Sequence, residues 1–133
     1  MKNILRATAL VLVIVFVLSF AACKKGPEYS VELVQGKLQD VVNIIQRNGH
    51  LHTDDYVAGM TEDEFEPVYD AIYEVVGNQS DIEYKLISES TDEDDDGNLF
   101  YILKYEIKAN GNGVTVEVKY GDRQNSLYSI ELK

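Results

Sequence analysis

Apolar positions recur at steps of three and four residues in the segment that follows residue 29. The repeating positions of 30–48 are Val31, Val34, Leu38, Val41, Val42 and Ile45. Ser30 can cap the start of a helix, and Asn48-Gly49 is a favoured stop. This period predicts an amphipathic helix over 30–48. Gly36 lowers helix propensity and predicts a close contact between this helix and the sheet.

A second helical stripe follows a polar stretch. Its apolar positions are Phe65, Val68, Tyr69, Ile72, Val75 and Val76, and Gly77-Asn78 ends it. Thr61 and Glu64 have the spacing of a capping box, in which each side chain accepts the other residue's backbone N–H. Pro67 has no N–H to donate, so we expect a kink there or a helix that begins later than Thr61 allows.

After Ser80 the apolar period changes from nearly four to two. Alternation runs through 82–86, 99–108, 114–120 and 128–133, with one apolar and one mostly charged set of residues in each segment. Turn residues separate the later segments: Asp96-Gly97-Asn98, Asn110-Gly111-Asn112-Gly113 and Gly121-Asp122. The pattern predicts a four-stranded antiparallel meander with one solvated face. On this register Leu103 faces the core and Lys104 faces water.

Two helices followed by four strands predict one α+β domain over 30–133, with the helices on the apolar face of the sheet. Five of the nine tyrosines fall on the apolar set of their strands: Tyr84, Tyr101, Tyr105, Tyr120 and Tyr128. We expect most of them to be core residues whose hydroxyls reach the rim or a partner. The alternative is that several of these tyrosines line a pocket for a small ligand or peptide.

The first 22 residues have a different pattern. Lys2 and Arg6 are followed by an uncharged run, Ala7 to Ala22, with an aliphatic centre. A basic start, an apolar core and small residues at the end are typical of a secretory signal peptide, and the run is short for a membrane-spanning helix. We therefore expect residues 1–22 to be removed and 23–29 to form a tether.

Phe20-Ala21-Ala22-Cys23 resembles the lipobox of bacterial lipoproteins, although Phe20 stands where that family more often has Leu. The resemblance implies that the sulfur of Cys23 receives a diacylglycerol and that cleavage precedes this residue. Two or three acyl chains anchor a protein stably, whereas one binds reversibly. The expected location is the extracytoplasmic face of the cell membrane.

The net charge of the mature chain limits the kinds of partner that it can bind. The leader carries two of the twelve basic residues and no acidic one, so ten Lys and Arg stand against 23 Asp and Glu, a net charge of −13. Such a surface repels nucleic acid and anionic lipid headgroups. Cys23 is the only cysteine, so no disulfide can form within the chain.

The order of helix, loop, helix ending in Val75-Val76-Gly77 and a meander ending in Ser126-Leu127-Tyr128-Ser129-Ile130 is similar to small lipoproteins of the nuclear-transport-factor-2-like, cystatin-like superfamily. The resemblance covers nearly all of 28–133 and implies a cone between helices and sheet. Members of that superfamily include both enzymes and binding modules, so the fold does not select a function.

Two segments carry candidate metal chemistry. Asp92, Asp94 and Asp96 before Gly97 resemble the opening of a calcium loop, but its twelfth position is Leu103 and strands flank it. A solvated hairpin connection is the alternative. The second segment is 50–55, His-Leu-His-Thr-Asp-Asp.

In this segment His50 and His52 place two imidazoles on one side of an extended chain, where a nearby Asp could complete a zinc or iron site. An enzyme would pair either histidine with Asp54 or Asp55 as base and orienting group. An exposed interhelical loop is the third interpretation.

Taken together, these patterns predict a membrane-anchored, non-catalytic binding or assembly module with a protein or small-molecule partner and no cofactor. The small enzyme and the weak calcium-binding protein are the alternatives.

Overall fold

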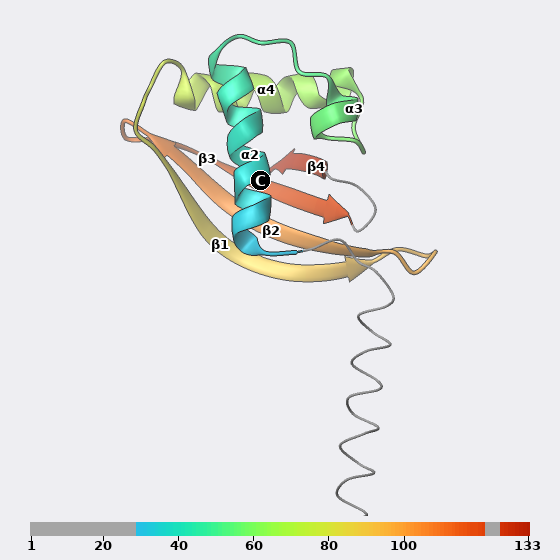
Figure 1. The fold of residues 1–133 in the computed structure, drawn as a ribbon. Coiled ribbons are helices and arrows are strands. Elements are labelled where there is room, and N and C mark those ends of the chain that lie inside the picture. Colours follow the sequence, from blue (N-terminus) through green and yellow to red (C-terminus); the bar gives the residue numbers. More distant parts are fainter. Residues whose placement is uncertain (1–28, 122–125) are drawn as a thin grey trace, which may run out of the picture.

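The computed structural model describes residues 29–121 and 126–133, so the predicted leader, Cys23 and most of the predicted tether lie outside the described residues (Figure 1). The elements are α2 (Val31–Gln46), α3 (Thr53–Tyr56), α4 (Glu62–Val76), β1 (Ile82–Glu93), β2 (Leu99–Ala109), β3 (Asn112–Gly121) and β4 (Leu127–Leu132). The strands form one antiparallel sheet in the order β1-β2-β3-β4. The predicted α+β class with a four-stranded meander is confirmed.

Helix α2 begins where its sequence provides a cap. The Ser30 hydroxyl accepts the backbone N–H of Leu33 at 3.1 Å, which satisfies one of the unpaired amides of the first turn. The apolar stripe is fully buried at Val34, Leu38, Val41, Val42 and Ile45. The predicted close contact at Gly36 is wrong, because no described atom of another element lies within 4 Å of the position a Cβ would take.

Helix α4 begins with the predicted capping box. The Thr61 hydroxyl accepts the N–H of Glu64 at 3.2 Å, and a Glu64 carboxylate oxygen accepts the N–H of Thr61 at 3.1 Å. The backbone N–H and the hydroxyl of Thr61 both donate to the Glu64 carboxylate, and these two hydrogen bonds lower the pKa of Glu64. The helix starts directly after Thr61, at Glu62, and Pro67 lies inside it, so the late start is wrong.

The concave face of the sheet carries the core and is covered by α2 and α4 (Figure 1). Its buried residues are Leu103, Tyr105, Ile107 and Ala109 of β2, Val116, Val118 and Tyr120 of β3, and Leu127 and Ile130 of β4. Asn110 and Gly111 both have positive φ, the conformation of a type I′ hairpin turn, and so join β2 and β3 in register.

Strand β1 is longer than the predicted 82–86, and a bulge interrupts its pairing with β2. Leu86 pairs with Tyr105 and Ser88 with Lys104, so Ile87 is an extra residue. An extra residue reverses the alternation that follows it. Glu89 consequently lies opposite Leu103 on the inner face of the sheet. The residues of β1 that follow the bulge, Glu89 included, are exposed.

A second irregularity corrects the placement of Tyr128. Lys119 pairs with Ser129 but Tyr120 pairs with Leu127, which leaves Tyr128 as the extra residue. Its ring lies 5.0 Å from that of Phe100, and the Lys119 Nζ lies 4.4 Å from the Phe100 ring centre on the outer face. The assignment of Tyr128 to the apolar face is therefore wrong. The other four tyrosines assigned to that face belong to the core or pack against it.

Tyr29, predicted as the last tether residue, packs on the sheet. Its ring stacks on Tyr101 with 3.7 Å between centres and an angle of 4°. The Tyr29 hydroxyl donates to the Glu89 carboxylate. Burial and this hydrogen bond raise the pKa of Tyr29, so its hydroxyl stays protonated and keeps donating at neutral pH. The chain is thus fixed to the sheet one residue before the cap of α2.

Leu103→Ala tests the register of β2. Leu103 is fully buried, so the variant should lower the free energy of unfolding by about 2–5 kcal/mol, measured by urea denaturation. Lys104→Ala on the outer face is the control and should change stability by no more than about 0.5 kcal/mol. Equal losses in the two variants would contradict this register.

Two glycine-to-alanine variants should shift stability in opposite directions. Gly36→Ala should raise the free energy of unfolding by about 0.5–1 kcal/mol, because the helix has room for a methyl group. Gly59→Ala should lower it by about 1–3 kcal/mol, because the added carbon would lie 2.5 Å from the Tyr128 carbonyl oxygen. A neutral Gly59→Ala in thermal and urea unfolding would show that this loop is not packed against β4.

Candidate functional site

The segment after α2 presents two histidines on one side. Leu51 is buried in the core, and in an extended chain its neighbours on both sides point the opposite way. The rings of His50 and His52 therefore meet edge to face with 4.7 Å between their centres. The local prediction that His-x-His puts two imidazoles together is confirmed.

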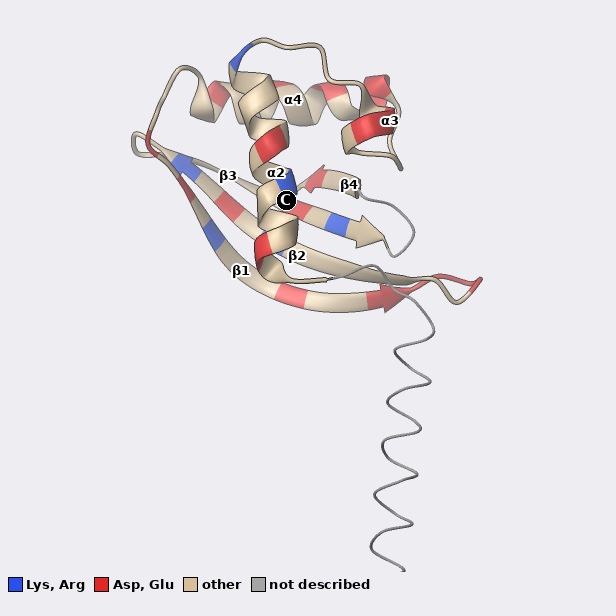
Figure 2. Ribbon diagram, in the orientation of Figure 1, with Lys and Arg blue, Asp and Glu red and all other residues tan. Residues whose placement is uncertain are grey.

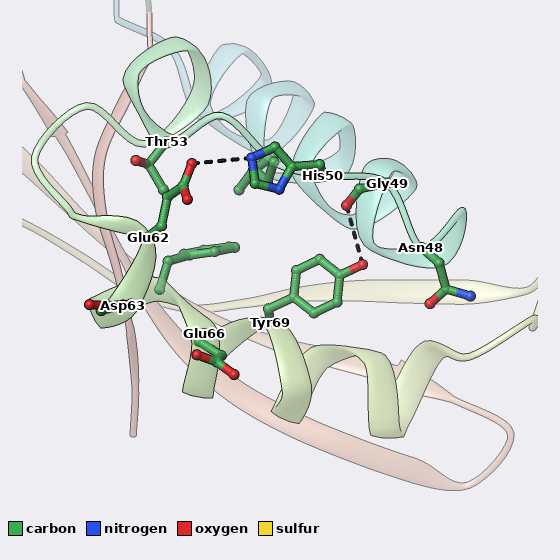
Figure 3. A pocket seen from close by; sticks show the side chains of 10 residues that line it. Asn48, Gly49, His50, Thr53, Glu62, Asp63, Glu66 and Tyr69 are labelled. Atoms are coloured by element: carbon green, nitrogen blue, oxygen red, sulfur yellow. Dashed lines mark hydrogen bonds and ion pairs between the residues drawn. The ribbon is translucent and has the colours of Figure 1, made fainter.

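Tyr69 of α4 holds the start of this segment. Its hydroxyl donates to the carbonyl oxygen of Gly49 at 3.3 Å, beside a longer contact to that of Ile45 at 3.5 Å (Figure 3). Gly49 follows the end of α2, and the Ile45 carbonyl also accepts the backbone N–H of Asn48 at 3.0 Å. Burial raises the pKa of Tyr69, which keeps the hydroxyl a donor. The backbone before His50 is thereby attached to α4.

The far end of the segment is also held. Thr53 is buried and begins α3, and the N–H of Val57 donates to the Thr53 carbonyl at 2.7 Å. Val57 is fully buried and pairs with Leu127 as a parallel bridge at the edge of β4. The chain from Gly49 to Val57 is therefore attached to α4 at one end and to the sheet at the other.

Glu62, the first residue of α4, completes a group of three. Its Oε1 lies 3.2 Å from the Nε2 of His50, as Figure 3 shows, and both side chains are more than half exposed. Nitrogen and oxygen atoms of His50, His52 and Glu62 all lie within 4.8 Å of one another. Among the described residues, this is the one group of three His, Cys, Asp or Glu side chains close enough to share a metal ion.

His50 and Glu62 line an open depression of about 420 Å³ between the end of α2 and the start of α4. Asp63 and Glu66 from α4 line it together with His50 and Glu62 (Figure 3). Figure 2 shows that acidic residues recur along α4 and in α3. The depression therefore combines the imidazole of His50 with a negative local field that favours a cation.

The carboxylates expected beside the histidines are not the ones that meet them. Asp54 and Asp55 belong to α3 and are outside the group, and Asp55 lines a separate depression with Lys37 and Tyr56. Sequence reasoning missed Glu62. Its available signal was the acidic first turn of a capped helix, but nothing local indicates that this turn returns to the histidines.

The acidic segment before Gly97 is a hairpin connection. Asp92 lies in β1 opposite Phe100, while the Asp94 carboxylate accepts the backbone N–H groups of Asp96 at 3.0 Å and Asn98 at 2.8 Å. The Asn98 side-chain amide donates to Asp94 as well. Asp94 thus organises the turn, and within the described chain Asp92, Asp94 and Asp96 do not form a ligand group.

Comparison of the chain with protein-family models, with curated proteins and with solved structures gave no match. The described part of the chain contains no helix that is both long and apolar enough to cross a membrane.

Calcium should not saturate the hairpin loop. Calorimetric titration of the wild type should give only weak, non-saturating heats below about 1 mM calcium, because the Asp94 oxygens already accept hydrogen bonds within the turn. Replacement of Asp92, Asp94 and Asp96 by Asn should leave the fold intact and the titration unchanged. One saturable calcium ion per chain that is lost in the triple variant would contradict this result.

Proposed function

We propose that this protein is a lipid-anchored, extracytoplasmic module that binds a protein or small-molecule partner without catalysing a reaction. The observation that carries the proposal is Cys23, directly after an apolar leader and six residues before the start of the described domain at Tyr29. Six residue steps span at most about 22 Å when extended, so the anchor would hold the domain close to the membrane surface.

The attachment point supports one orientation of the domain. The tether reaches the sheet at Tyr29, which stacks on Tyr101 at the N-terminal end of α2. The His50 depression lies beyond the other end of this 16-residue helix, about 24 Å away along its axis. The proposed orientation therefore presents the depression away from the membrane, and the strong negative charge of the chain keeps the domain off anionic headgroups.

The packing between helices and sheet supports binding over catalysis. In the cone-shaped domain implied by the family resemblance, a ligand or active site would occupy this layer. Here the layer is filled by fully buried apolar side chains such as Leu38, Ile72 and Leu103. In the described segments the buried polar or charged residues are Thr53 and Ser126, and neither is an acid–base pair. Partners would accordingly be bound at the surface.

One buried hydroxyl belongs to this layer. Tyr105 is fully buried, and within the described residues its hydroxyl has no hydrogen-bond partner. Burial raises the pKa of Tyr105 to about 12, with the negative charges of Glu32 and Glu89 adding to the effect. Tyr105 is therefore neutral at physiological pH and is no general base there.

Metabolic labelling with an alkyne fatty acid tests the anchor. The wild type should be labelled and recovered with membranes, whereas Cys23→Ser should be unlabelled and released, because the thioether is the proposed site of attachment. Lys24→Ser is the matched control, since it changes the adjacent residue and leaves the sulfur in place. A wild type that is embedded in the membrane but unlabelled would overturn the proposal and indicate an uncleaved apolar anchor.

A further inference from the structure

We propose that His50, His52 and Glu62 bind one divalent transition-metal ion of the zinc type at the end of the domain that faces away from the anchor. The proposal names a ligand for the binding module, and it rests on that proposed function for its location outside the cytoplasm. The metal site itself depends only on the geometry of these three side chains.

The donor atoms suit this class of cation. Two imidazole nitrogens and one carboxylate oxygen form a set that binds Zn²⁺ in proteins, whereas Ca²⁺ and Mg²⁺ prefer oxygen ligands alone. Bonds of about 2.0–2.1 Å in a tetrahedral site place neighbouring ligand atoms about 3.3–3.4 Å apart. The His50 Nε2 and Glu62 Oε1 are already 3.2 Å apart.

His52 needs only a small side-chain movement to join them. Its ligand atom lies within 4.8 Å of both partners, and all three side chains are exposed, so no packed core has to shift. Exposure also leaves the fourth coordination position open to water or to a donor from a bound partner. The site therefore needs no rearrangement of the fold to form.

The backbone is already arranged for such a site. The Tyr69 hydroxyl holds Gly49 before His50, and burial of Leu51 directs both imidazoles outward. On the other side, the Thr61–Glu64 capping box fixes the turn that carries Glu62. Holding ligands on fixed segments reduces the entropy lost on binding, and an ordinary surface ion pair does not require it.

Charge around the site favours a cation. Asp63 and Glu66 line the same depression, and none of the described lysines or arginines lines it. This excess of negative charge attracts divalent ions in general. The histidines are what separate a specific transition-metal site from diffuse attraction, so the test has to report on the imidazoles and not only on bound charge.

Zinc titration of the full chain, purified in detergent without a polyhistidine tag, tests the proposal. Calorimetry should show one saturable Zn²⁺ per chain, and excess Mg²⁺ should not compete. His50→Ala, His52→Ala and Glu62→Gln should each weaken binding at least about tenfold, because each removes a direct ligand. Circular dichroism and thermal unfolding without metal should show that the three variants remain folded.

Asp54→Asn is the matched control for Glu62→Gln. It removes one carboxylate charge three residues from the centre of the His-x-His segment but outside the proposed ligand group, so zinc affinity should be unchanged. Equal losses in Asp54→Asn and Glu62→Gln would overturn the proposal in favour of diffuse acidic attraction. Absence of saturable zinc binding by the folded wild type would overturn it as well.

The chain offers a spectroscopic readout because it has only two histidines, and both belong to the site. Zinc should shift both imidazole ¹⁵N signals in NMR spectra, and a shift of only one would contradict the three-ligand site. The Cys23→Ser chain should bind zinc as the wild type does. Retained zinc binding without lipid labelling would refute the anchor alone, and labelling without zinc binding would refute the metal site alone.

Discussion

Burial of two helical stripes against one face of the sheet is the constraint on which the rest of the structure depends. The sheet has four strands, its outer face meets water, and a chain with a single cysteine has no internal disulfide. Stability therefore comes from apolar area removed from water between α2, α4 and strands β2 to β4. Leu38, Ile72 and Leu103 are fully buried in this layer, and elements the helices do not cover stay exposed.

The two sheet irregularities lie in the edge strands, β1 and β4. Beyond the bulge at Ile87, strand β1 extends past the helices and places polar side chains such as Glu89 on the inner face. At the other edge of the sheet, the N–H groups of Ala58 and Gly59 donate to carbonyl oxygens of β4. These oxygens have no neighbouring strand to bond to, so the loop supplies their hydrogen-bond partners. Tyr128 turns outward there, and its ring packs against that of Phe100. The Tyr128 ring lies against Gly59 and the Phe100 ring against Gly121, so the two aromatic side chains cover these glycines.

The chain segment between α2 and α4, which is attached to the edge of β4, also positions the candidate site. The chain must travel from the end of α2 to the sheet edge and back to α4, and both ends of this path are held by buried or hydrogen-bonded residues. The path brings the histidines over the first turn of α4, so that His50 and Glu62 meet. The negatively charged surface repels anions, and at this point it also carries two imidazole nitrogens beside a carboxylate. A cation is therefore the ligand that fits the site best.

The sequence by itself determined the class of the fold, the two long helices and the four-strand meander, because apolar periods of 3.6 and 2, caps and turn residues act over a few neighbouring positions. The Thr61 capping box and the Asn110-Gly111 turn are examples, and so is the contact between His50 and His52. Tertiary structure decided the rest. Tyr128 points outward because it is itself the extra residue of a bulge in β4, and the bulge at Ile87 reverses the alternation that follows it in β1. Glu62 joined the histidines because buried Leu51 and the Tyr69 hydroxyl bring two helix ends together, and contacts between distant segments leave no local pattern in the sequence.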